Sequence, residues 1–418
     1  MSRVLVIIGL LLFNSMTVNA QTWENVKSFF TMGEASKLAE PAKIKVLIQP
    51  LIDGVLLDIK GAYNIYDPLN KQRLGTRFFG KSRFIQAREG GLRWGEEFPG
   101  IFQLVFVPDR PDTTTLINGI EYKGVIFVYQ IGNDKISIVN EIDIEDYIKS
   151  VLGAQFDEAL LPETMAALAI VARTDAYYYR SKNLDKFWHI TASQAGYKGF
   201  AVTHKNNGVD DAVDMTRYLV MNDVVDGSVF PARWTEHSGG KTVAFQTLFR
   251  KSVPGPKVSV EAPFAALNRE ETKWSCSVAI EDLARLAKLD KITDMQIFRD
   301  KESSKVYAIR FQDILQSSDV DFLSLQEDLG EDLLQSSEFT VDREGDRVIF
   351  SGYGKGHGVG LCVYSAEKMV EKGNDAAKVL RSFFPEVLLK LEPEVLLKPS
   401  SKPTELVKKR KKVNSDSY

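Results

Sequence analysis

Cysteine and histidine are scarce in this chain of 418 residues, which contains two cysteines and four histidines. The spacings typical of zinc sites are absent, since the sequence has neither Cys-x-x-Cys nor His-Glu-x-x-His. We therefore expect no metal and no cofactor. For Cys276 and Cys362 two alternatives stay open, one disulfide or two buried free thiols.

An excess of charge of one sign is also absent, because 53 Lys and Arg face 56 Asp and Glu. This balance gives no indication of nucleic-acid binding. Glycines 352–360 superficially resemble a phosphate-binding loop, but no Gly-Lys-Ser/Thr follows, so we expect no nucleotide site.

Long apolar runs are missing too. The run Val4–Phe13 is about ten residues long, whereas a membrane-spanning helix needs about 20. Preceded by Arg3 and followed by Val18-Asn19-Ala20, this run is typical of a secretory signal peptide over residues 1–20. We expect a mature protein that begins near Gln21, does not span a membrane, and is secreted, periplasmic or in the cell envelope.

The apolar content of 44% is sufficient for two or three globular parts. A short helix and linker are expected over residues 21–43. Period-two alternation then predicts an antiparallel β-rich region over residues 44–140. A mixed α/β domain is expected over residues 141–386, with a solvated acidic insertion near 319–332, and residues 387–418 are expected to form a disordered basic tail. The predicted fold class is α+β.

A long apolar helix is predicted to begin at Pro162 and to run to about Tyr179. Its apolar residues cover almost the whole circumference, which is typical of a buried central helix. Arg173 interrupts this surface and needs a partner, because an isolated buried charge is very costly. It could belong to a structural ion pair or to a functional site.

Two glycine-rich turns each contain a histidine, His237 in the first turn and His357 in the second. Glycine allows backbone conformations that are closed to other residues, so a tight turn explains the glycines without explaining the histidines. We therefore predict that the two turns share a site. Its expected substrate-binding residues are Arg173, His237, Ser238, Gly239, Gly240, Gly356, His357 and Gly358.

Several ordered motifs resemble those of the SpoIID/LytB family, which comprises stage II sporulation protein D and amidase enhancers. They run from about residue 44 to 386, and their order is more specific than any one of them. The motifs are Asn118–Gly124, Val139-Asn140, Ile144–Tyr147, Glu163 with Ala169–Thr174, Gln194 with Tyr197 and Gly199, His237–Thr242, Trp274, and Gly356–Gly360.

The resemblance implies an α+β envelope protein that acts on peptidoglycan. Active members of the family are lytic transglycosylases, which cleave glycan strands stripped of stem peptides and leave 1,6-anhydro-muramic ends. In that chemistry a single glutamic acid protonates the glycosidic oxygen and then serves as the base. The implied partners are peptidoglycan glycan strands and an N-acetylmuramoyl-L-alanine amidase.

The sequence departs from the family at the position of that glutamate, where Gln155 stands. Glutamine cannot transfer the proton, and losing general acid–base catalysis typically costs about 10²–10⁴ in rate. Two other carboxylates are candidates for the catalytic role. Glu158 would lie near Gln155 if the segment is helical, and Glu236 could face the same groove.

Two further departures concern residues near the motifs. Cys362 and Val363 replace a usual Ser-Gln pair, and Asp175 replaces an aromatic residue. We therefore expect a protein that binds denuded glycan during division or wall remodelling and is a lytic transglycosylase only if a carboxylate replaces Gln155. The alternative is a non-enzymatic amidase enhancer or glycan-binding module.

Overall fold

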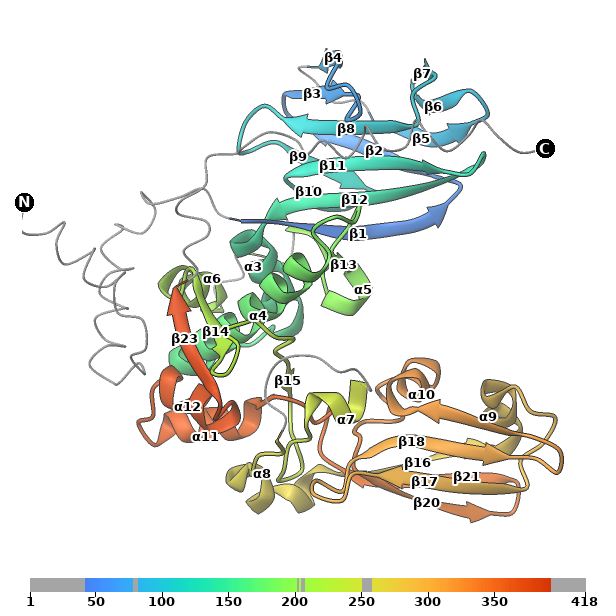
Figure 1. Ribbon diagram of the computed structural model, residues 1–418, viewed down its shortest axis with the longest axis vertical. Helices are drawn as coiled ribbons and strands as arrows, with labels where there is room; N and C mark the ends of the chain where they lie inside the picture. Colours follow the sequence, from blue (N-terminus) through green and yellow to red (C-terminus); the bar gives the residue numbers. More distant parts are fainter. Residues whose placement is uncertain (1–41, 78–81, 201–202, 204–206, 250–257, 392–418) are drawn as a thin grey trace, which may run out of the picture.

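The computed structural model describes residues 42–77, 82–200, 203, 207–249 and 258–391. These residues form three parts, a β-sandwich at the top of Figure 1, a layer of helices in the middle and a second β part at the bottom. The predicted signal peptide, the segment before residue 42 and most of the predicted basic tail lie outside the described residues. The α+β class predicted from the sequence is confirmed.

The N-terminal sandwich consists of two sheets whose neighbouring strands are antiparallel, except for the parallel pair β1 and β13. In sheet order, the first contains β13 (Ile190–Thr191), β1 (Lys43–Ile52), β12 (Lys135–Asp143), β11 (Val125–Ile131), β8 (Gln103–Pro108), β3 (Tyr63–Tyr66) and β4 (Arg73–Arg77). The second contains β10 (Ile120–Lys123), β9 (Thr114–Ile117), β2 (Gly54–Lys60), β5 (Arg83–Arg88), β6 (Gly91–Trp94) and β7 (Glu96–Pro99). Trp94 packs edge-on against Phe106 across the two sheets, with ring centroids 5.1 Å apart.

The helical layer surrounds α4 (Pro162–Lys182), the central helix predicted from the sequence. Every residue of α4 from Thr164 to Tyr178 is buried, as predicted. The helix contacts β1 and the elements α3 (Ile144–Gln155), α6 (Val209–Met215), β14 (Leu219–Asp223), α11 (Val363–Glu371) and α12 (Ala376–Phe383). Among the described residues, no helix is long and apolar enough to cross a membrane.

The predicted boundary at residues 140 and 141 does not separate two cores. One hydrophobic cluster is continuous from the sandwich into the helical layer, and it includes Ile138 of β12 and Ile148 of α3. Strand β12 leads directly into α3, because the Asp143 carboxylate accepts a hydrogen bond from the Glu145 amide at 2.7 Å and caps the helix. Strand and helix are therefore one continuous support.

The predicted disordered tail begins too early in the sequence. Residues Val387–Leu391 form strand β23, which pairs antiparallel with β14 from Asp223 to Leu219. The apolar side chains of this strand pack on the helical layer, which gives the segment a hydrophobic reason to be ordered. The chain therefore continues its fold to at least residue 391.

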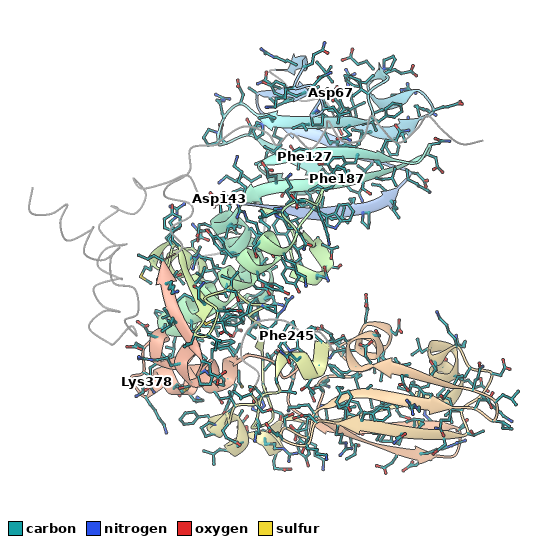
Figure 2. The ribbon with its side chains drawn as sticks, viewed as in Figure 1. Asp67, Phe127, Asp143, Phe187, Phe245 and Lys378 are labelled. Carbon is teal, nitrogen blue, oxygen red and sulfur yellow. The ribbon has the colours of Figure 1, made fainter. Side chains whose placement is uncertain are left out.

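The C-terminal β part has its own core and two three-stranded sheets. One sheet contains β16 (Lys273–Ala279), β21 (Arg347–Tyr353) and β20 (Phe339–Glu344), and the other contains β17 (Asp294–Arg299), β18 (Val306–Gln312) and β19 (Ser317–Asp321). Helices α9 (Ile280–Ala287) and α10 (Phe322–Leu329) accompany them. In Figure 2, Phe245 lies where this part meets the helical layer.

The acidic segment near residues 319–332 is not a solvated insertion. It contains part of β19 and all of α10, and Phe322 and Leu325 of this helix are buried in the C-terminal core. The acidic residues occupy the exposed side of an amphipathic helix. A helix is present in this segment, and its apolar face belongs to the core.

A buried ion pair joins the elements of the helical layer. Arg173 of α4 is 0% exposed, and its Nε and Nη2 donate to the Glu145 carboxylate of α3 at 3.0 and 2.7 Å. Nη1 donates to the Thr216 hydroxyl and the Leu219 carbonyl, and Nη2 also donates to the Val213 carbonyl. All five guanidinium N–H groups thus have partners.

We expect Arg173→Met to destabilise the protein by about 3–5 kcal/mol, because it leaves the Glu145 carboxylate buried without a cation. The double variant Arg173→Met, Glu145→Gln should recover part of this loss. Urea denaturation followed by circular dichroism measures the change. Arg285→Met, which removes an exposed ion pair with Asp282, is the control and should change little. Equal midpoints for the two single variants would contradict the expectation.

Candidate functional site

The first glycine turn follows strand β15 (Trp234–Thr235) and contains His237. The His237 Nδ1 atom accepts a hydrogen bond from the Gly239 amide at 3.1 Å. Gly239 and Gly240 have φ angles of 70° and 122°, in the left-handed region that favours glycine. A Cβ at Gly239 would lie 2.5 Å from the Glu338 carboxylate, so the Glu338 side chain packs closely against the turn.

The second glycine turn precedes strand β22 (Leu361–Cys362) and repeats the same arrangement. The His357 Nδ1 atom accepts a hydrogen bond from the Val359 amide at 3.0 Å. A Cβ at Gly360 would lie 1.9 Å from the Arg233 carbonyl oxygen. Glycine is required here by close backbone approach as well as by the positive φ of 79°.

The two turns lie against each other, as expected from the sequence. The His237 and Lys355 backbones exchange hydrogen bonds of 3.0 and 2.8 Å. The Thr235 hydroxyl donates to the Lys355 carbonyl at 3.0 Å and accepts from the Gly358 amide at 3.1 Å. Strands β15 and β22 pair in parallel beside them, so the turns form one rigid unit.

The imidazole rings of both histidines are neutral and form hydrogen bonds within their own turns. Reasoning from the sequence did not predict this structural role. An Nδ1 atom that accepts an amide hydrogen carries no proton, so each neutral ring is protonated at Nε2. Burial and the Arg233 guanidinium lower the pKa of His357 to about 3. Burial, and then Lys305, lower the pKa of His237. Histidine here stabilises the turn itself, which corrects the inference that a turn alone could not explain it.

Gln155 is the last residue of α3 and is exposed. The Trp234 indole Nε1 donates to its Oε1 atom at 2.8 Å. Gly196, which follows helix α5 (Ala192–Ala195), lies beside the Gln155 amide, since a Cβ there would be 3.9 Å from Nε2. Three separate segments of the chain therefore meet at the position where the resemblance implies the catalytic acid.

Glu158 does not have the helical spacing that was expected from the sequence. Helix α3 ends at Gln155, Phe156 is its C-cap with extended backbone, and Glu158 lies in the bend that follows. Its side chain is exposed. The argument that placed the Glu158 carboxylate one helical turn from Gln155 is therefore wrong, although Glu158 remains close in the chain.

Glu236 follows β15 and lies in a bend, so the alternation of side chains along a strand does not place its carboxylate. Thr235 is buried against the second turn, and Trp234 is the residue of this segment that contacts Gln155. The Glu236 carboxylate is 60% exposed and pairs with Lys355 at 2.8 Å.

Arg173 and Ser238 are too deeply buried to be the contacts that were predicted for a glycan. The Arg173 side chain is 0% exposed and belongs to the structural ion pair with Glu145, which settles the alternative that the sequence left open. Ser238 is 1% exposed. Its amide donates to the buried Cys362 Sγ atom at 3.4 Å, so Ser238 and Cys362 help hold the turn.

The two other departures from the family pattern have structural roles. Asp175 of α4 pairs with Arg233 at 3.3 Å, and burial raises the pKa of Asp175 to about 6 against the effect of this guanidinium. Arg233 also donates to the Tyr179 hydroxyl at 3.1 Å. Cys276 and Cys362 are both free, the first partly exposed and the second buried, which agrees with the alternative of two thiols.

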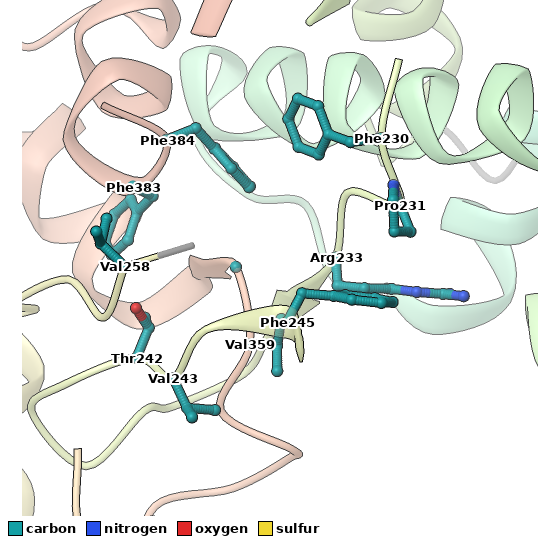
Figure 3. Close-up of a pocket in the computed structure, with 11 residues that line it drawn as sticks. Phe230, Pro231, Arg233, Thr242, Val243, Phe245, Val258, Val359, Phe383 and Phe384 are labelled. Atoms are coloured by element: carbon teal, nitrogen blue, oxygen red, sulfur yellow. The ribbon is translucent and has the colours of Figure 1, made fainter. Parts of the chain in front are cut away.

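A pocket of about 370 Å³ lies beside the turns and is drawn in Figure 3. Its walls are largely apolar, with Phe230, Phe383 and Phe384 on one side and Val359 on the other. The polar side chains in its lining are the Arg233 guanidinium and the Thr242 hydroxyl. A sugar needs several hydrogen-bonding groups, so this pocket does not fit a glycan, and it contains none of the predicted site residues.

Among the described residues, no group of three or more His, Cys, Asp or Glu side chains could hold a metal ion. The contact at Gln155 is composed of an amide and an indole N–H, and the exposed carboxylate of Glu236 lies two residues after Trp234 in the chain. These groups can donate and accept hydrogen bonds to hydroxyl-rich molecules. The amide of Gln155 cannot serve as a general acid.

Comparison with known proteins places the chain in a family. Residues 132–222 match the family model described as SpoIID, stage II sporulation protein. An uncharacterised protein of Chlamydia pneumoniae is 36% identical over 212 residues, which are 50% of this chain and 76% of that protein. The chain belongs to the SpoIID family.

Two relatives from Bacillus subtilis have names that refer to sporulation or to an amidase. Stage II sporulation protein D is 22% identical over 276 residues, 62% of this chain and 76% of that protein. The protein named amidase enhancer is 23% identical over 291 residues, 58% of this chain and 40% of that protein. The resemblance stated from the motifs is thereby confirmed.

His357→Asn should weaken the pH dependence of stability below pH 6.5. The folded pKa of His357 lies below its ordinary value, so the unfolded state binds more protons and stability falls as pH decreases from 6.5 toward 3. One such group contributes at most about 1.4 kcal/mol per pH unit. Asparagine can still accept the Val359 amide hydrogen but does not titrate. Urea denaturation midpoints of both proteins between pH 4 and 7 measure the difference, and parallel curves would contradict a His357 ring that stays neutral in the folded protein.

Proposed function

We propose that this protein binds peptidoglycan glycan strands whose stem peptides an amidase has removed, and that it does so outside the cytoplasmic membrane during division or wall remodelling. The observation that carries the proposal is the hydrogen bond between Trp234 and Gln155 at an exposed surface, with the exposed Glu236 two residues further along the chain. Membership of the SpoIID family and the name of the amidase enhancer support a role in the cell wall. The apolar start of the sequence supports export.

Binding at this surface requires little rearrangement. The end of α3 is fixed by its packing in the helical layer, and β15 is fixed by its pairing with β22. The Trp234 indole offers an aromatic face of the kind on which sugar rings pack, and Gln155 offers an amide with donors and an acceptor. Glu236, two residues after Trp234 in the chain, offers an exposed carboxylate that accepts hydrogen bonds.

Rapid cleavage is not expected, because the position of the implied general acid carries an amide. The Trp234 N–H group donates to the Gln155 oxygen, and it would donate equally to a carboxylate at this position. The scaffold around the acid is thus retained without the acid. Any residual lytic transglycosylase activity, which would yield anhydro-muramic products, must use another carboxylate, and Glu236 and then Glu158 are the candidates.

A non-enzymatic role is the second candidate function. One relative is named amidase enhancer, and this chain lacks the family's carboxylate at residue 155. A protein that holds denuded glycan without cutting it could recruit or stimulate an N-acetylmuramoyl-L-alanine amidase. Product analysis separates this role from slow cleavage.

The mature protein should sediment with amidase-treated peptidoglycan and less with untreated peptidoglycan. Trp234→Phe removes one hydrogen bond at the surface while keeping a ring, and we expect it to weaken retention by about two- to tenfold. Trp94→Phe is the matched control, since the Trp94 indole N–H donates to the Leu57 and Arg83 carbonyls inside the remote sandwich. Equal retention of the wild-type protein on treated and untreated peptidoglycan, or retention on neither, would contradict the proposal.

Mass spectrometry of the same incubations decides between the two candidate functions. Anhydro-muramic ends that disappear in Glu236→Gln or in Glu158→Gln identify the replacement acid. Their absence at high protein concentration, with binding intact, supports the non-enzymatic role. Products that survive both substitutions would contradict the assignment of these carboxylates.

A further inference from the structure

The segment 335–338, at the edge of the C-terminal β part, supports both glycine turns from one side. The Gln335 carbonyl accepts the Gly356 amide hydrogen at 2.7 Å, and the Ser337 hydroxyl donates to the His357 carbonyl at 2.9 Å. The Glu338 carboxylate lies where a Gly239 side chain would be. One short segment therefore contacts the second turn through the Gln335 backbone and the Ser337 side chain, and the first turn through the Glu338 side chain.

Lys305 is the cation in this support, and it is 1% exposed. Its Nζ atom donates to the Ser238 carbonyl and, at 2.5 Å, to the Glu338 carboxylate. The aliphatic part of Lys305 lies under the second turn, because a Cβ at Gly358 would be 3.2 Å from its Cε atom. A single side chain thus touches both turns.

Glu338 also receives a second cation. Arg269 donates to its other oxygen at 2.6 and 3.1 Å, and the Arg269 guanidinium stacks on the Tyr353 ring at 3.6 Å. A buried ion pair is seldom more stabilising than well-packed apolar side chains of the same volume. The directional contact of Lys305 with the Ser238 carbonyl is what an apolar side chain could not supply.

We propose that Lys305 is a positioning residue for the glycan surface, which it fixes by holding the Ser238 carbonyl and hence the first turn. The turn pairs with Lys355 through the His237 backbone, and Lys355 in turn pairs with Glu236 beside Trp234. The C-terminal β part thereby determines the geometry of a surface that lies on the helical layer. This inference rests on the proposed function for its binding readout alone.

The titration midpoint of His237 is sensitive to the Lys305 charge and can be measured without any glycan. The charged groups around it are Lys305, which disfavours the protonated ring, and Glu236 and Glu338, which favour it, with the Asn268 side chain as a further polar neighbour. The Tyr364 ring covers one side, with centroids 4.8 Å apart. Because the chain has four histidines, selective histidine labelling gives a resolvable nuclear magnetic resonance titration.

The test compares two substitutions with opposite electrostatic effects in the full mature protein. Lys305→Met should raise the titration midpoint of His237, because a nearby cation is lost. Glu338→Gln should lower this midpoint, because a nearby anion is lost. General loosening of the turn would move both toward the ordinary value near 6.5, so opposite shifts identify the charge contact. Lys291→Met, at an exposed position, is the control and should leave the midpoint unchanged.

Sedimentation with amidase-treated peptidoglycan supplies the second readout. We expect Lys305→Met to reduce retention several-fold, and Lys305→Arg, which keeps the cation, to restore part of it. Unshifted His237, or shifted His237 with wild-type retention, would overturn the proposal. If Lys305→Met does not fold, Glu338→Gln decides by the same two readouts. If wild type itself does not bind glycan, the proposed function is wrong. The shifts of the His237 titration midpoint in the variants still show whether Lys305 contacts the turn.

Discussion

The buried contact between Arg173 and Glu145 is the constraint on which the middle of this molecule depends. A fully desolvated guanidinium must satisfy five N–H groups, and it does so by fixing α3, α6 and β14 around α4. The orientation of α3 in turn sets the position of its last residue, Gln155, against Trp234. A charge far from solvent thus determines the geometry of an exposed surface.

The residues that carry the family resemblance are largely structural. The Tyr197 hydroxyl donates to Asn140 at 2.7 Å and ties the segment after α5 to β12, and the Glu163 carboxylate accepts the Ala376 amide hydrogen at 2.9 Å. The histidine turns belong to the same class, since each ring accepts an amide hydrogen two residues later. The family pattern in this chain therefore specifies a scaffold.

Periodicity in the sequence was sufficient to predict an antiparallel β-rich region before residue 141 and the central helix, because both patterns reflect burial on known faces. It did not identify every strand of the sandwich, such as β3 and β5. It could not predict the end of α3 at Gln155, since no glycine or proline stands in the six residues that follow. It also missed β23, whose apolar residues stand in a repeated, charged segment. The role of Arg173 depended on partners distant in sequence, such as Glu145 and Leu219, and no local pattern identifies those.

We infer that this protein retains the support for a catalytic acid at residue 155 and lacks only the acid. The most direct measurement is the rate of anhydro-muramic product formation by Gln155→Glu on amidase-treated glycan, relative to wild type. We expect a rise of about 10²-fold or more, with glycan retention unchanged. Intact retention without any gain in product would contradict it, because the surface at Gln155 would then lack more than a carboxylate.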